Sequence, residues 1–125
     1  MRDFRKFVVW NEAIDLADQI YTVCDEFPKY ELFALSDQLR RAAVSIPSNI
    51  AEGSSRTSDV EFAHFLEIAL GSAFEVETQL QIAYRRGFVT EENYKSVLLL
   101  INTIEKRLNG FITKLRASKI VTNTL

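Results

Sequence analysis

Apolar residues recur every three or four positions along most of this chain, a spacing that is typical of amphipathic helices. Proline, glycine or polar turn residues divide this repeat into four stripes. The stripes consist of Trp10, Ala13, Ala17, Ile20, Cys24 and Phe27; of Leu32, Leu35, Leu39, Ala42, Ile46 and Ile50; of Phe62, Leu66, Ala69, Ala73, Val76, Leu80 and Ala83; and of Val97, Ile101, Ile104, Leu108, Phe111 and Leu115. No segment shows the alternation of a strand. The spacing predicts an all-α protein with helices over roughly residues 8–27, 31–53, 59–86 and 91–117.

The residues between the stripes indicate where each helix begins and ends. Pro28 ends the first helix, because the residue before a proline is pushed out of the helical region. Gly53 ends the second, a capping box of Ser58 and Glu61 opens the third, and Gly87 supplies the left-handed residue that closes it. Since the three connections are short, consecutive helices must run antiparallel. We expect a single domain of 125 residues, an antiparallel up-down-up-down four-helix bundle, whose polar tail frays after residue 117.

The stretch SIPSNIAEG, residues 45–53, places polar groups and a proline inside the second helix. Pro47 removes a backbone donor and should kink the helix, and nearby Ser and Asn side chains can satisfy the freed groups. A glycine in mid-helix usually marks the close approach of another backbone, and Gly71 is predicted to lie against the second helix in this way. We interpret these residues as a structural device, with partners on the third helix. The predicted set is Ser45, Pro47, Asn49, Glu52, Gly71, Ser72, Glu75 and Gln79.

The third helix carries more apolar residues than the core of a four-helix bundle requires. Phe65, Ile68, Leu70 and Phe74 lie off its main stripe. A helix that is apolar around most of its circumference is buried by further neighbours or lies in a subunit interface. We expect self-association through these four residues. Arg40 and Arg41 lie beside the core stripe of the second helix, where a guanidinium can pair with an acid across the same interface.

The composition argues against most catalytic chemistries. One cysteine and one histidine leave no disulfide within the chain and almost no ligands for a metal. Glu61 and His64 match one Glu-x-x-His element of a di-iron bundle, but such a site needs a second histidine. Carboxylate pairs drawn from Glu52, Glu75 and Glu77 stay open as an alternative. We expect no enzyme, no cofactor, no metal, no membrane span and a cytoplasmic location.

Several motifs resemble those of a known bacterial family. They are Trp10-Asn-Glu-Ala13, Phe27-Pro28, the run from Leu35 to Gly53 that contains SIPSNIAEG, Ile68-Ala-Leu-Gly-Ser72 and Glu75-Val-Glu-Thr-Gln-Leu80. The likeness covers roughly Phe4 to Leu115 and is to the four-helix-bundle proteins encoded in intervening sequences of 23S ribosomal RNA, also called the S23 ribosomal protein family. The resemblance implies a ring-shaped homopentamer. A similar relative, the accessory variability determinant of diversity-generating retroelements, binds nucleic acid and associates with a reverse transcriptase.

The up-down topology brings together bases that are far apart in the sequence. The chain start, the connection between the second and third helices, and the end of the fourth helix should share one end of the bundle, hereafter the basic end. Its predicted cations are Arg2, Arg5, Lys6, Arg56, Lys114, Arg116 and Lys119. A ring would repeat this cluster in each subunit and make phosphate contact multivalent. The alternative for any one of these residues is that it complements a helix C-terminus and maintains solubility.

Two functions from different classes follow. The first is a non-enzymatic oligomer that binds nucleic acid, with structured RNA preferred over DNA. The second is a protein–protein scaffold or accessory subunit, for example of a reverse transcriptase, with no nucleic-acid role of its own. A di-metal enzyme is the third and weakest alternative, and only stoichiometric metal in the purified protein would revive it.

Overall fold

The computed structural model describes the backbone of residues 2–124 and the side chains of residues 2–117. Four long helices make up most of this part of the chain, and it contains no strand. They are α1 (Val8–Cys24), α2 (Leu35–Ser54), α3 (Asp59–Arg85) and α4 (Glu91–Thr124), with two short 3-10 helices, η1 (Phe4–Lys6) and η2 (Lys29–Glu31). The prediction of an all-α protein with four helices is confirmed.

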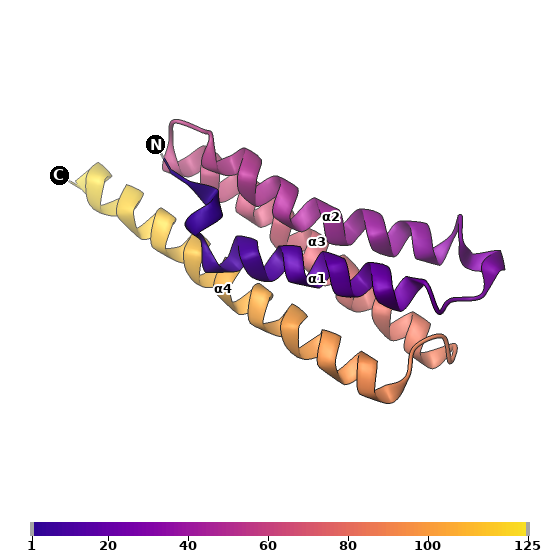
Figure 1. Ribbon diagram of the computed structural model, residues 1–125. Coiled ribbons are helices and arrows are strands. Elements are labelled where there is room, and N and C mark those ends of the chain that lie inside the picture. The colour runs from indigo at the N-terminus through magenta and orange to yellow at the C-terminus, as the bar shows by residue number, and fades with distance from the viewer. Residues whose placement is uncertain (1, 125) are drawn as a thin grey trace.

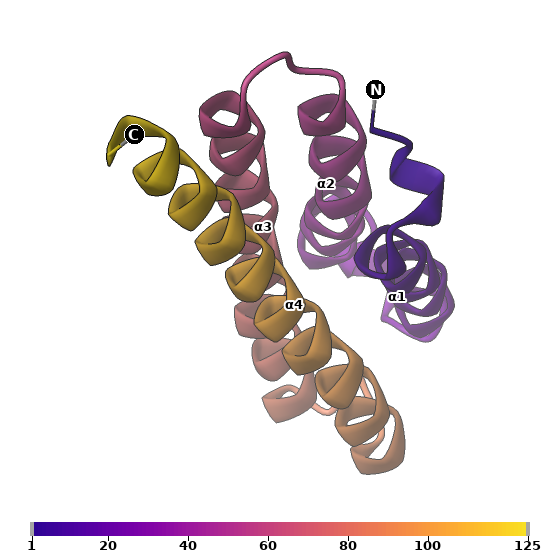
Figure 2. The same cartoon turned by 90° about the vertical axis from the view of Figure 1, so that its left-hand side faces the viewer.

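The helices form an antiparallel bundle in which each packs against two others. α2 contacts α1 and α3, and α4 contacts α3 and α1, so the order around the bundle is α1, α2, α3, α4. In Figure 1 the N-terminus, the α2–α3 connection and the C-terminal end of α4 lie at one end, and the other two connections lie at the opposite end. Figure 2 shows the same grouping of the chain ends from the side. The bundle therefore has an α1–α2 face and, on its opposite side, an α3–α4 face.

The core consists of the apolar stripes predicted from the spacing. Among its largest fully buried side chains are Leu16, Phe62 and Ile104, which come from three different helices. Leu32 was wrongly assigned to this core: it is exposed in the turn that follows η2. The first two helices are shorter than predicted, because residues 25–34 form the connection between them. In this connection the ring of Phe27 packs on the ring of Phe88.

Predicted capping residues occur at both ends of α3. The Ser58 hydroxyl accepts a hydrogen bond of 3.1 Å from the Glu61 backbone N–H, which is one half of the predicted capping box. Gly87 has a positive φ of 76°, and the N–H of Phe88 donates to the carbonyl of Ala83 at 2.9 Å. This pattern satisfies carbonyls that the helix end leaves free. α4 continues as a helix to Thr124, past the predicted end near residue 117, and the fraying of the tail stays a prediction.

The structure corrects the roles of two glycines. The second helix was expected to end at Gly53, and α2 does end one residue later, at Ser54; Gly53 is not in the left-handed conformation of a cap, however, and is buried against α3. A Cβ atom on Gly53 would lie 2.6 Å from the Cβ of Phe65, so only glycine fits without movement. Gly71 was expected to mark this approach; it is exposed, and nothing lies within 4 Å of the place a Cβ would take. Pro47 lies inside α2 without ending it, and the bend predicted there stays a prediction.

Candidate nucleic-acid interface and association surfaces

The basic end exists as the topology predicted. η1, the α2–α3 connection and the last turns of α4 bring cations from three distant segments to one end of the bundle (Figure 1). Six of the seven predicted cations have described side chains; that of Lys119 lies outside the described residues. What the sequence does not show is how many of these charges are already compensated within the chain.

Arg2 is held tightly by its own chain. Its guanidinium donates to the backbone carbonyl of Arg56 at 2.6 Å and forms an ion pair with Asp59. It also lies 4.7 Å from the centre of the Phe62 ring, which adds a cation–π contact. Only 26% of its side chain is exposed. These contacts tie the chain start to α3, so Arg2 has a structural role that competes with phosphate binding.

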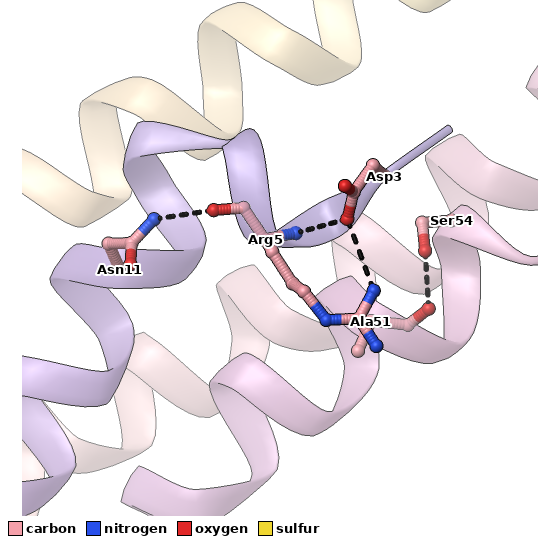
Figure 3. A network of polar contacts seen from close by, with 5 residues as sticks. All are labelled: Asp3, Arg5, Asn11, Ala51 and Ser54. Carbon is pink, nitrogen blue, oxygen red and sulfur yellow. Dashed lines mark hydrogen bonds and ion pairs between the residues drawn. The ribbon is translucent and has the colours of Figure 1, made fainter. Parts of the chain in front are cut away.

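Arg5 is held more loosely, as Figure 3 shows. Its guanidinium lies 3.2 Å from a carboxylate oxygen of Asp3, and both side chains are well exposed. The same carboxylate caps η1 by accepting from the backbone N–H of Arg5. Asn11 donates to the Arg5 carbonyl at 3.0 Å, which joins η1 to α1. Behind them, at the end of α2, the Ser54 hydroxyl donates to the carbonyl of Ala51 at 2.6 Å.

Arg56 and Arg116 line a shallow groove of about 510 Å³ at the basic end. Arg56 forms an ion pair with Glu52 at 3.2 Å and lies over the Phe65 ring, and Arg116 forms an ion pair with Glu67. The groove is thus lined by charges of both signs. Glu52, which was predicted to belong to the structural polar set, takes part here instead.

Lys6 and Lys114 are exposed, and neither is paired with an acid in the described residues. They are the two cations of the basic end with the least competition for a phosphate. The end as a whole is close to neutral, because five acids lie among its six described bases. These acids are Asp3, Glu52, Asp59, Glu61 and Glu67.

The predicted association residues lie on two sides of α3. Phe74 is 53% exposed and lines, with the half-buried Leu70, a groove between α3 and α4. Ile68 is 41% exposed and lies on the side of α3 nearer α2. Phe65 is half-buried beneath Arg56. The structure therefore does not bring these four side chains into one patch.

A second apolar surface lies on the α1–α2 face, where Ile14, Tyr21 and Val44 are exposed. Arg40 lies over the Tyr21 ring, with its guanidinium carbon 5.9 Å from the ring centre, and donates to the Leu32 carbonyl at 3.3 Å. No acid pairs with Arg40 in the described part of the chain, whereas Arg41 pairs with Asp37 at 3.0 Å.

Some of the polar residues predicted to link the second and third helices form hydrogen bonds between α2 and α3, but not all of them with the expected partners. The hydroxyls of Ser45 and Ser72 lie 2.8 Å apart, and the Asn49 amide donates to both the carbonyl and the hydroxyl of Ser45. Gln79 is buried and donates to Gln38 at 3.4 Å, so it is no partner of Asn49.

Glu75, the remaining member of that set, is exposed on α3. Glu77, which the sequence offered only as a partner for Glu52 or Glu75, instead pairs with Glu105 on the α3–α4 face, and Glu105 was missed. Burial, and then a hydrogen bond with Glu77 and the charge of Glu77, raise the pKa of Glu105 to about 7. The only signal in the sequence was that Glu105 adjoins the core residue Ile104.

Cys24 and His64, the two side chains that could suggest catalysis, lie in different parts of the bundle. Cys24 is buried, and burial raises the pKa of its thiol, which disfavours the nucleophilic thiolate. His64 is exposed beside Phe65. In the described part of the chain no three His, Cys, Asp or Glu side chains gather as a metal would require, and none of its helices is long and apolar enough to cross a membrane.

These features define a small all-α bundle protein whose charged and apolar groups of interest lie on its outer surface. The chain belongs to the family of 23S rRNA-intervening sequence proteins, whose model matches residues 5–110. It is also similar to a crystal structure of a protein with unknown function from the S23 ribosomal protein family of Bacteroides thetaiotaomicron VPI-5482. The two are 30% identical with a TM-score of 0.76, and the match covers 84% of this chain and 98% of that one. No curated protein matches the chain.

Proposed function

We propose that the protein is a self-associating helical bundle without catalytic activity that binds structured RNA through its basic end. The observation that carries the proposal is the convergence of cations from η1, the α2–α3 connection and α4 at one end of the bundle. The family takes its name from intervening sequences of 23S rRNA, which makes RNA the nucleic acid to test first.

The ion pairs at this end allow such a role because most of them are exposed. An exposed ion pair contributes only about 0–1 kcal/mol, so a phosphate can replace its carboxylate at little cost. Arg5 and Arg116, whose side chains are 70% and 53% exposed, can exchange partners in this way. Arg2 stays with Asp59. Each copy then offers only a few phosphate contacts, and useful affinity requires several copies on one RNA.

The salt dependence of RNA binding tests this proposal. Binding of a structured RNA should weaken steeply between about 50 and 200 mM salt. The double variant Lys6→Ala/Lys114→Ala should bind more weakly and lower the slope of log K against log salt by about 1 for each phosphate that the protein no longer touches. The matched control is Lys29→Ala/Lys95→Ala, because both lysines are exposed at the opposite end of the bundle. Equal losses of affinity in the two variants, or no binding at the lowest salt, would contradict the proposal.

The second candidate is a scaffold or accessory subunit, for example of a reverse transcriptase, that recruits a protein and has no nucleic-acid role. The near-balance of acids and bases at the basic end favours it, as do the exposed apolar side chains on α1, α2 and α3. An assembled protein that fails to bind RNA even at low salt would support this candidate over the first.

A further inference from the structure

We propose that copies of this chain pack head to tail, with the α1–α2 face of one copy on the α3–α4 groove of the next and Arg40 placed against Glu77 and Glu105. The inference rests on the proposed self-association and adds which faces meet and which charges pair. Because the two faces lie on opposite sides of the bundle, every copy can use both. Such heterologous contacts produce closed rings or filaments instead of dimers.

The α3–α4 groove supplies an apolar seat with uncompensated acids. It has a volume of about 390 Å³ and is lined by Leu70 and Phe74 of α3 and by Asn102, Glu105, Lys106 and Asn109 of α4. One carboxylate oxygen of Glu105 is buried and has no hydrogen-bond partner. With the Asn102 amide turned to donate, its nitrogen lies 3.2 Å from Glu77 Oε1 and 3.3 Å from Glu105 Oε1. Neither acid forms an ion pair within the described chain.

The α1–α2 face supplies the complement. Ile14, Tyr21 and Val44 are exposed on this face, and the Arg40 guanidinium has a backbone carbonyl and the Tyr21 ring as neighbours but forms no ion pair among the described residues. A planar guanidinium that is already oriented loses little freedom when it binds a carboxylate with two parallel hydrogen bonds. Within the described chain, one apolar surface thus carries an unpaired cation, and the other lies beside two unpaired acids. When the first surface of one copy packs on the second surface of the next, these charges can pair.

Glu105 makes the association sensitive to pH. The charged groups that face it are Glu77 of α3 and Lys106 of α4. In the free chain its pKa of about 7 leaves much of the carboxyl protonated at neutral pH. A guanidinium placed against it favours the ionised form and lowers that pKa. Association therefore releases protons, and it should strengthen as the pH rises through about 7.

Size exclusion with light scattering, run over a range of concentrations, tests the pairing. The wild-type protein should have a mass greater than two copies. Arg40→Glu and Glu105→Arg should each weaken association at least about tenfold, since each places like charges together. The double variant Arg40→Glu/Glu105→Arg should recover part of it, because opposite charges again face each other at these two positions while Glu77 is unchanged. Lys95→Glu is the control, because Lys95 pairs with Glu91 on its own helix, and circular dichroism checks that each variant folds.

The outcomes separate this inference from the function on which it rests. A wild-type protein that stays monomeric at every concentration would overturn the self-association itself. An oligomeric protein whose mass is unchanged by either single variant, or not even partly recovered in the double variant, would overturn the pairing of faces alone. A mass of two copies would overturn the head-to-tail arrangement. RNA binding by a monomer would overturn the assembly and, with it, the multivalent contact on which the proposed RNA affinity depends.

Discussion

Replacing Gly53 with alanine should destabilise the protein, although alanine is by far the better helix former. Gly53 lies near the end of α2, buried against α3. The new methyl carbon would lie 2.6 Å from the Cβ of Phe65, 3.0 Å from Cδ1 of Phe62 and 3.4 Å from the Phe62 carbonyl oxygen. The Cβ of Phe65 is fixed to the backbone of α3 and cannot rotate away. The two helices must therefore move apart at this point.

Two opposing effects set the size of the change. Alanine in place of glycine in a helix interior contributes about 1 kcal/mol in favour of the folded state. Overpacking a filled site by a methyl group costs about 1–3 kcal/mol, and a contact to a backbone-fixed atom belongs in the upper part of that range. The expected net loss in the free energy of unfolding is about 1–2 kcal/mol.

Urea unfolding followed by circular dichroism measures this difference, at one subunit concentration for all variants because association contributes to stability. Gly71→Ala and Gly110→Ala are matched controls, since both glycines lie in helices with nothing within 4 Å of the new Cβ. Each control should gain up to about 1 kcal/mol. If Gly53→Ala also stabilised the protein, the close approach of α2 and α3 at this residue would be refuted.

Three further substitutions test other contacts. At a subunit concentration too low for association, Glu105→Gln should raise the free energy of unfolding at pH 8 by about 1 kcal/mol after allowance for partial exposure, and should not raise it near pH 4. The reason is that a carboxyl whose pKa is raised on folding, here from 4.5 to about 7, destabilises the folded state as it ionises; Glu75→Gln, at an exposed position of α3, is the control in the same urea series. Arg2→Ala should cost about 1–2 kcal/mol in thermal or urea unfolding through the loss of its hydrogen bonds and cation–π contact. Ser72→Ala should cost about 1 kcal/mol or less, because Ser45 keeps a second partner. These assignments would be contradicted if Arg2→Ala left the free energy of unfolding unchanged, or if Ser72→Ala lowered it by about 3 kcal/mol.

The four helices could be predicted because the features that determine them are local. A spacing of three and four, a proline, a left-handed glycine and a serine cap each act within a few residues, and the sequence displays them directly. The close approach of another backbone was assigned to Gly71 and not to Gly53 for a different reason. Whether a helical glycine meets another backbone depends on the distance between helices, and the sequence around Gly53, with two serines after it, looks the same as a helix end. Only the packing of α2 on α3 distinguishes the two.

The surface charges show the same limit on a larger scale. Topology alone placed the cations at one end correctly, because the ends of antiparallel helices must meet. Their availability depends on which acids lie opposite them, and Asp59 and Glu67 reach Arg2 and Arg116 from a different helix. Among the side chains that the structure describes, net charge at that end is thus small within one copy, whereas Arg40 and Glu105 form no ion pair on opposite faces. Since a folded chain seldom leaves oriented charges without partners beside exposed apolar groups, both proposals depend on contacts between copies.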